Sequence, residues 1–207
     1  MSASTVAFVL TVPHRVCAEH PQGRHTCDTL AVDAAEWLRE WLLQLGATVK
    51  GPILGDVSRT EVVDLNRRES RGYEWRRDLD SRLVEMLGST PYVFLVDVHS
   101  FDTGAPWTAR AELEGRPRPV LAFLNDRKFV NVVGMPEALR NALPGAWREL
   151  VSVGGSPQND IVARAREIGV RWSVLIEFSE AEARSDPDWL SRVTLTIARA
   201  MLGITRL

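Results

Sequence analysis

The sequence has few cysteines, little net charge and no long apolar run, and each of these absences excludes a class of protein. Two cysteines, Cys17 and Cys27, are too few for the disulfide framework of a small secreted domain. A formal net charge of −2 provides no basic field to hold phosphates, so no nucleic-acid partner is expected. No apolar run approaches the ~20 residues that span a bilayer, and no basic segment precedes the first one. We therefore expect a cytoplasmic protein without a membrane partner.

The 207 residues, of which 45% are hydrophobic, predict one domain covering residues 1–207. Short apolar runs predict buried strands at 6–12, 92–98, 120–124 and 172–178, with shorter candidates at 47–49 and 61–65. Helical periodicity or helix-start signals predict helices at 30–45, 70–87, 136–151, 157–168 and 186–202. The glycine- and proline-rich segment 101–119 is predicted to be a loop. Alternating strands and helices indicate an α/β fold, with a mostly parallel sheet and helices on both faces.

Three predicted strands carry a polar residue at or near their end. His14 follows the first strand, His99 follows the strand at 92–98, and Glu177 lies near the end of the strand at 172–178. Because α/β sheets bind ligands beyond the carboxyl ends of their strands, we expect these residues on one rim. Burying the Glu177 carboxylate alone costs several kcal/mol, so it requires an arginine partner, a metal or a raised pKa.

This set of residue types is typical of a metal-dependent hydrolase. Two histidines and a carboxylate bind zinc with one position left open for water, and a further glutamate there acts as general base. Arginines bind carboxylates or stabilise an oxyanion. The sequence contains no G-x-G-x-x-G, P-loop, G-x-S-x-G, C-x-x-C or H-E-x-x-H motif. The pattern therefore predicts metal-assisted amide hydrolysis.

Four short segments carry a family resemblance: V-P-H at 12–14, V-D-L-N-R at 63–67, V-D-V-H-S at 96–100 and I-E at 176–177. In this order they resemble the N-formylglutamate amidohydrolases, which are similar to aspartoacylase, succinylglutamate desuccinylase and, more distantly, zinc carboxypeptidases. The resemblance implies a three-layer, zinc-exopeptidase-like (phosphorylase/hydrolase-like) α/β fold with a mixed, mostly parallel sheet. It also implies a single catalytic domain.

The resemblance implies a role for each matching residue in the reaction. His14 and His99 match two ligands of one Zn²⁺ per chain. Glu177 matches the glutamate that activates the zinc-bound water. Arg59 stands five residues before Asp64, which matches the arginine that stabilises the oxyanion.

The segment after Val63 matches the part of the family that holds the substrate. Asn66 and Arg67 match the pair that binds the substrate's carboxylate, and Arg71 is expected to assist them. Asp64 is expected to orient a metal ligand or Arg67 from outside the metal shell. The implied substrate is a small N-formyl or N-acyl amino acid.

The third metal ligand has three candidates. Asp28 stands where the family has an aspartate at the head of the first helix, although aspartate is also a favoured helix N-cap. Glu19 lies in the preceding loop, and Cys17 is able to ligate as a thiolate. We rank them in that order.

Other readings of the same residues remain open. A carboxypeptidase-like or cell-wall peptide hydrolase would use the same metal shell, and a non-catalytic binding protein on this scaffold is a third reading. Oxidation of Cys17 and Cys27 is a further hypothesis for regulating the site.

Overall fold

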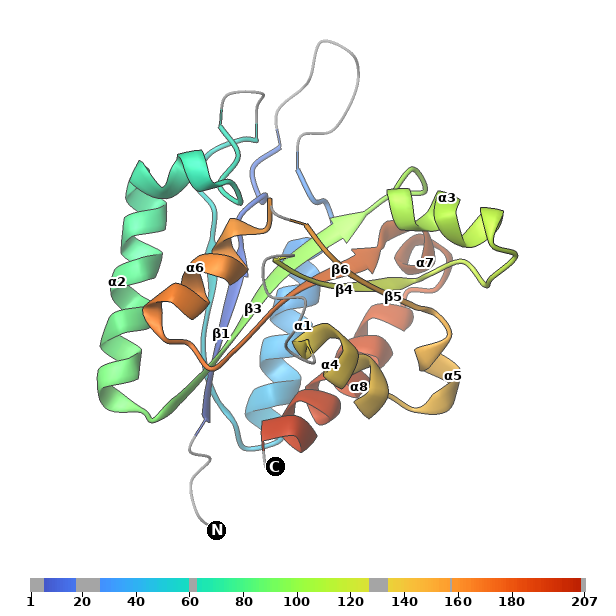
Figure 1. The fold of residues 1–207 in the computed structure, drawn as a ribbon. Coiled ribbons are helices and arrows are strands. Elements are labelled where there is room, and N and C mark those ends of the chain that lie inside the picture. Colours follow the sequence, from blue (N-terminus) through green and yellow to red (C-terminus); the bar gives the residue numbers. More distant parts are fainter. Residues whose placement is uncertain (1–5, 18–26, 60–62, 127–133, 157, 206–207) are drawn as a thin grey trace.

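Short apolar runs form the six strands of one sheet in a computed structural model, which describes residues 6–17, 27–59, 63–126, 134–156 and 158–205. In chain order the strands are β1 Val6–Val12, β2 Thr48–Leu54, β3 Tyr92–Phe101, β4 Leu121–Asn125, β5 Val151–Gly155 and β6 Trp172–Ser179. Their order across the sheet is β2-β1-β3-β6-β4-β5 (Figure 1).

Most neighbouring strands are parallel. β1 pairs parallel with β2 and β3, and β3 pairs parallel with β6. β4 is antiparallel to β6 and parallel to β5. The mixed, mostly parallel sheet confirms the predicted α/β class. The carboxyl ends of β1, β3 and β6 meet at one edge, where ligand sites of such sheets form.

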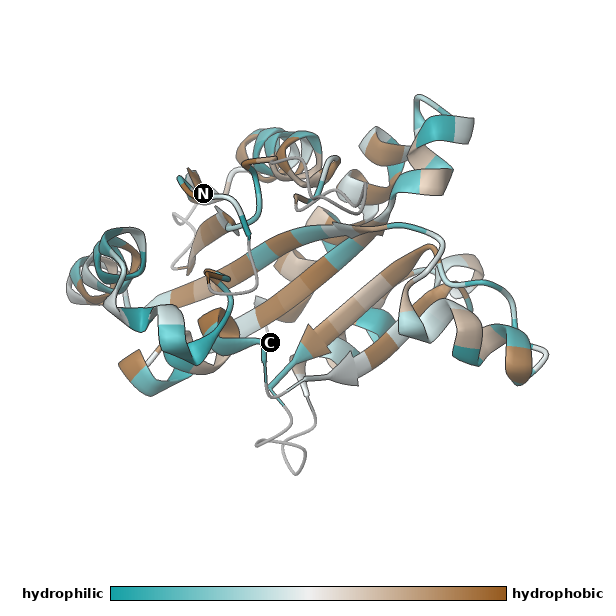
Figure 2. Cartoon of the chain, turned by 90° about the horizontal axis from the view of Figure 1, so that it is seen from above, coloured by the Kyte–Doolittle hydropathy of each residue, from teal (hydrophilic) through white to brown (hydrophobic). Residues whose placement is uncertain are grey.

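Helices cover both faces of this sheet (Figures 1 and 2). They are α1 Ala31–Gln44, α2 Glu74–Ser89, α3 Pro106–Leu113, α4 Met135–Ala142, α5 Gly145–Arg148, α6 Asp160–Ile168, α7 Glu180–Ser185 and α8 Trp189–Thr205, with a 3₁₀ turn at Arg68–Gly72. Phe94 and Val96 of β3 pack in a buried cluster with α1, α4 and α8. Val93 and Leu95 point to the opposite face and pack with α2 and α6. This alternation, which follows from the two-residue period of a strand, produces the three layers.

None of the helices in the described part of the chain is both long and apolar enough to cross a membrane.

The predicted strand at 61–65 is wrong for its described residues, because residues 63–65 belong to no strand. The Asp64 carbonyl accepts from the Arg67 N–H at 2.9 Å, and the Asp64 carboxylate accepts from the Asn66 N–H at 2.9 Å. These local bonds form a turn instead of a strand. Residues 61 and 62 lie outside the described part. The helix predicted at 70–87 begins at Glu74, after the 3₁₀ turn.

Proline accounts for two further corrections. The predicted loop at 101–119 contains α3, whose first residue is Pro106, a position that needs no N–H donor. The predicted helix at 136–151 ends at Ala142, because Pro144 disfavours helical backbone at Leu143. The short α5 follows, and β5 begins at Val151. The helix predicted at 186–202 is α8, and the separate α7 precedes it.

Candidate metal centre

Strand register aligns the polar residues of the central strands. β3 is longer than predicted, so His99 lies inside it and is paired directly with Glu177 of β6. Asp97 stands two residues before His99 and therefore points to the same face. Thr11 of β1 pairs with Asp97, and its hydroxyl donates to Asp97 Oδ1 at 2.7 Å. The sheet itself thus fixes His99, Glu177 and Asp97 relative to one another.

His14 and Asp28 enter the same site from the connection between β1 and α1. The Asp28 N–H donates to the His14 carbonyl at 2.9 Å, which closes the ends of this connection. Asp28 does not cap α1, because Leu30 occupies the N-cap position. Its carboxylate lies instead between the imidazoles, with Oδ2 2.7 Å from His99 Nδ1 and 3.3 Å from His14 Nδ1. The structure thus brings together His14, His99 and Asp28, the first-ranked third ligand.

Each imidazole has a second carboxylate on its far side. His14 Nε2 lies 2.7 Å from Asp64 Oδ1, and His99 Nε2 lies 3.0 Å from Asp97 Oδ2. Asp64 also accepts from Arg67 Nε at 3.0 Å, so it contacts both of the groups it was expected to orient. Carboxylates in this position fix the ring orientation and tautomer of a metal-binding histidine. Both Nδ1 atoms are consequently directed at the Asp28 carboxylate.

The tautomer of His14 follows from Arg59. A guanidinium has only donors, and Arg59 Nη1 lies 3.1 Å from His14 Nδ1. In the tautomer with the proton on Nε2, His14 donates to Asp64, and its Nδ1 lone pair, which here accepts from Arg59, is the one that a metal ion would take.

The electrostatics of the cluster favour a positive charge at its centre. Burial favours the neutral acid of Asp28, but His99 and His14 outweigh it and lower the pKa of this carboxyl below its usual range. Burial likewise opposes charge on His99, but Asp97 and Asp28 raise its pKa well above the usual value. The ionised Asp28 suits a metal ligand, which binds as the carboxylate.

The donor set fits a catalytic zinc ion. The potential ligand atoms of His14, Asp28 and His99 lie within 4.8 Å of one another, and all three residues are buried. Two imidazole nitrogens and one carboxylate oxygen are a common catalytic zinc shell, which leaves one position open.

Replacing Asp97 by asparagine is expected to weaken zinc binding about 10–100-fold, because the variant loses the charged partner of His99 Nε2. The measurement is zinc affinity by competition with a chromophoric chelator. Asp33→Asn, which changes an exposed carboxylate of α1, is the matched control and should bind zinc like the wild type. Unchanged affinity in Asp97→Asn would contradict this role.

Glu177 is the titratable residue beside this cluster. It is half-buried, and within the described part of the chain its carboxylate has no hydrogen bond. Burial raises the pKa of Glu177 to about 8; His99 and Arg59 lower it, whereas Asp28 and Asp97 add to the rise. A raised pKa is one of the three outcomes expected from the sequence, and this value lies in the range that suits proton transfer near neutral pH.

The residues predicted to bind the substrate lie in two separate parts of the structure. Arg59, Asn66 and Arg67 line a small cavity of about 130 Å³ together with His14, Asp64, His99, Gln158, Asn159, Leu175 and Glu177. Arg71 points elsewhere and forms ion pairs with Asp160 at 2.7 Å and Glu167 at 3.0 Å. Its assistance to Arg67 stays a prediction, and the geometry does not favour it.

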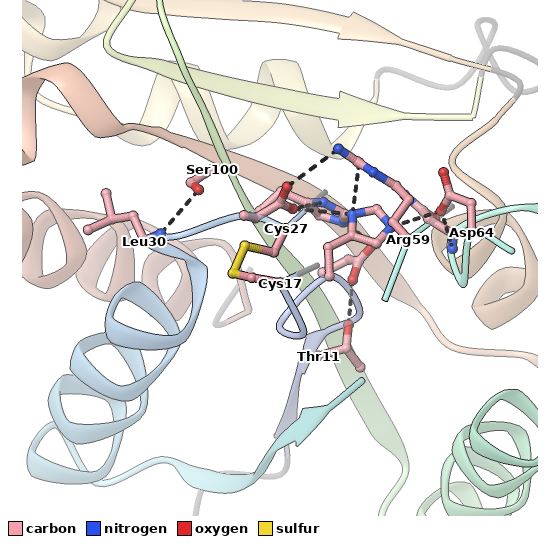
Figure 3. Close-up of polar contacts among 12 residues, drawn as sticks. Thr11, Cys17, Cys27, Leu30, Arg59, Asp64 and Ser100 are labelled. Atoms are coloured by element: carbon pink, nitrogen blue, oxygen red, sulfur yellow. Dashed lines mark hydrogen bonds and ion pairs between the residues drawn. A yellow bond between two sulfur atoms is a disulfide. The ribbon is translucent and has the colours of Figure 1, made fainter. Parts of the chain in front are cut away.

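Cys17 and Cys27 form a disulfide (Figure 3), a pairing that was not predicted from the sequence, although oxidation of the two was a hypothesis for regulating the site. Cys17 is therefore not a thiolate ligand in this structure, and Glu19 lies outside the described residues. The bond links Cys17, in the connection that follows β1, to Cys27, the residue directly before Asp28. Because disulfides persist mainly in oxidising compartments, it does not favour the expected cytoplasmic location, which stays a prediction.

A larger cavity of about 680 Å³ lies beside the same cluster. Its lining shares Arg59, His99 and Glu177 with the small cavity and adds Cys27, Asp28, Thr29, Ser100, Phe101, Asp102, Gly104, Ala105, Pro106, Trp107 and Glu180. Trp107 and Glu180 were not predicted from the sequence, and they lie on α3 and α7, two helices that were not predicted either. Asp97 had no predicted role, although its two-residue spacing to His99 in a strand was a usable signal.

Comparisons with known proteins find similarity in structure but not in sequence. No protein-family model matches the chain, and no curated protein matches it in sequence. The CwlD amidase of Clostridioides difficile, solved with the GerS lipoprotein, has a TM-score of 0.58 at 11% identity, covering 95% of this chain and 96% of that one. N-acetylmuramoyl-L-alanine amidase AmiC2 of Nostoc punctiforme has a TM-score of 0.54 at 11% identity, covering 100% of both chains.

A third solved structure belongs to the family that the sequence resembles. N-formylglutamate amidohydrolase from Ralstonia eutropha JMP134 has a TM-score of 0.52 at 14% identity, covering 96% of this chain and 94% of that one. The chain shares the fold of these amidases. At these identities the likeness concerns the fold, and the function has to be argued from the site.

Proposed function

We propose that this chain is a zinc-dependent amidohydrolase acting on an N-formyl or N-acyl amino acid. The observation that carries the proposal is the convergence of His14 Nδ1 and His99 Nδ1 on Asp28 Oδ2, with Glu177 in register beside His99. The chain shares its fold with two proteins named as amidases and one named as an amidohydrolase, which agrees with this chemistry. His14, Asp28 and His99 would hold the metal.

The residues that line both cavities would each have a role in hydrolysis. Bound zinc supplies a Lewis acid that polarises a carbonyl and lowers the pKa of water towards ~7. The Glu177 carboxylate takes the proton of the attacking water and then donates it to the leaving amine. Arg59, which lies in the cleft next to His14, stabilises the negative charge that develops on the carbonyl oxygen.

The small cavity would hold the amino-acid part of the substrate. Arg67 Nε donates to the Asp64 carboxylate, which leaves the other N–H groups of the guanidinium to bind a substrate carboxylate. Asn66 uses its side-chain oxygen to accept from the Ile161 N–H at 3.2 Å, which leaves its amide N–H groups for the substrate. Both residues are thus held by the protein before the substrate binds.

The larger cavity favours a second candidate, a carboxypeptidase-like or cell-wall peptide hydrolase that uses the same metal ligands. At about 680 Å³ it is large enough for more than one amino acid.

The experiment is hydrolysis of a panel of N-formyl and N-acetyl amino acids before and after metal removal. We expect the zinc-loaded chain to release free amino acid, dialysis against a chelator to abolish this activity, and added zinc to restore it. Activity that survives chelation would contradict the proposal. Failure of the zinc-loaded chain on the whole panel and on peptides would favour the non-catalytic reading.

A further inference from the structure

The two cavities meet at the candidate metal centre and differ in chemistry. The small one presents Arg59, Asn66 and Arg67 and is almost entirely polar. The large one combines aromatic and carboxylate side chains and has about five times the volume. Since Arg59, His99 and Glu177 line both, a substrate bound across the metal centre extends into both at once.

The direction of the substrate follows from the proposed function, on which this inference rests. An amide has its acyl group on one side of the reacting carbon and its amino-acid part on the other. If Arg67 binds the amino acid's carboxylate in the small cavity, the acyl group enters the large one. A formyl group adds only a hydrogen beyond the carbonyl and would leave nearly all of this space unfilled.

The lining indicates what acyl group would fill it. Phe101 and Trp107 pack edge to face, with ring centroids 5.2 Å apart, and form an aromatic wall. The carboxylates of Asp102 and Glu180 also line the cavity, whereas Arg59, the one arginine among the described lining residues, lies at the metal-centre end.

Both carboxylates keep accepting capacity. Asp102 Oδ1 accepts from the Gly104 N–H at 2.8 Å, and no bond to its other oxygen occurs within the described residues. Glu180 Oε1 accepts from the Ser100 hydroxyl at 2.8 Å, and the one contact of its second oxygen with the described residues is at 3.5 Å, with the exposed Arg184. An ammonium group on the ligand would pair with these carboxylates, and the face of an indole also attracts a cation.

We propose that the preferred substrates carry a bulky acyl group with an apolar or aromatic body and a protonated amine, bound between Trp107 and the carboxylates of Asp102 and Glu180. An aminoacyl group with an apolar side chain meets both requirements. Formyl and acetyl groups meet neither.

The test compares acyl groups on the amino acid that the zinc-loaded chain prefers. The acyl groups are formyl, acetyl, phenylalanyl and 3-phenylpropanoyl, of which the last matches phenylalanyl but lacks the amine. We expect kcat/KM to rise at least about tenfold from acetyl to 3-phenylpropanoyl, and about tenfold again to phenylalanyl, as for one partly desolvated charge pair. The double variant Asp102→Asn, Glu180→Gln should lose the second step, and Trp107→Ala should lower the first.

The possible results separate this inference from the proposed function. Equal or faster hydrolysis of the formyl substrate would overturn the inference and leave the amidohydrolase intact. A phenylalanyl preference that persists in the double variant would overturn the assignment of Asp102 and Glu180. Hydrolysis of no acyl amino acid would overturn the proposed function, and the inference with it.

Discussion

The Glu177→Gln variant is expected to bind zinc like the wild type and to turn over N-acyl amino acids about 10³-fold more slowly, within the range for loss of a general acid–base. Glutamine keeps the shape of the side chain but cannot take a proton from water. Zinc binding should persist because Glu177 is outside the His14, Asp28 and His99 cluster. The measurements are kcat on the best substrate and metal content by elemental analysis.

A matched control separates this effect from a general loss of fold. Glu85→Gln makes the same chemical change on an exposed position of α2 and should leave kcat unchanged. If Glu177→Gln retains kcat within a factor of about three while Glu85→Gln behaves as expected, another residue transfers the proton. Loss of zinc from Glu177→Gln would instead identify Glu177 as a ligand.

The second large effect concerns a buried ion pair that holds the turn at 64–67. Arg76 is 1% exposed, and its Nη1 donates to the carbonyls of Leu65 at 2.6 Å and Arg67 at 3.3 Å. Its Nη2 is paired with the buried Asp160 at 2.9 Å. The Asp160 N–H in turn donates to the Asn66 carbonyl at 3.1 Å. The pair therefore fixes the backbone that carries the proposed substrate residues.

Asp160→Asn is expected to lower the free energy of unfolding by about 3–5 kcal/mol, because it leaves the buried Arg76 guanidinium without its counter-charge. Equilibrium unfolding in urea at neutral pH measures the change. The control is Asp78→Asn, which removes the partner of exposed Arg82 on the same helix as Arg76 and should cost under about 1 kcal/mol. Similar losses of unfolding free energy in the two variants would show that the buried pair contributes no more to stability than the exposed pair.

The Asp160 effect should depend on pH in a defined direction. Burial raises the pKa of Asp160, but hydrogen bonds from Arg71 and Arg76 outweigh burial and lower it overall. The stabilisation is therefore complete above the unfolded-state pKa of about 3.9 and is lost as pH falls through the lower folded-state value. The difference in unfolding free energy between wild type and Asp160→Asn should be constant near neutral pH and shrink below about pH 4. A constant difference down to pH 2 would contradict the assignment.

The residues of the metal centre were predictable because strand ends determine their positions. Glu177 lies in an apolar run long enough to identify as a strand, His14 directly follows another, and parallel strands bring such ends to one edge. Asp28 was identified only through the resemblance, since its sequence context equally suits a helix N-cap. Its true environment depends on His99, 71 residues away, which no local pattern reveals.

The parts that were not predicted depend on distant contacts or weak local signals. Arg71 is paired with Asp160 and Glu167, which are 89 and 96 residues away, and such pairing is not encoded near Arg71. The missed strand β5 has only five residues, of which the last two are glycines. The Cys17–Cys27 disulfide depends on the tertiary approach of residues on either side of a loop.

We propose that His14, Asp28 and His99 together bind one zinc ion per chain. The most direct test is the zinc content of the purified chain after incubation with zinc and removal of excess metal, measured for wild type and His99→Ala. We expect about one zinc per wild-type chain and less than about a tenth of this in the variant, since a two-ligand site holds zinc poorly. Absence of zinc from the wild type, or equal zinc in both proteins, would contradict the proposed metal site.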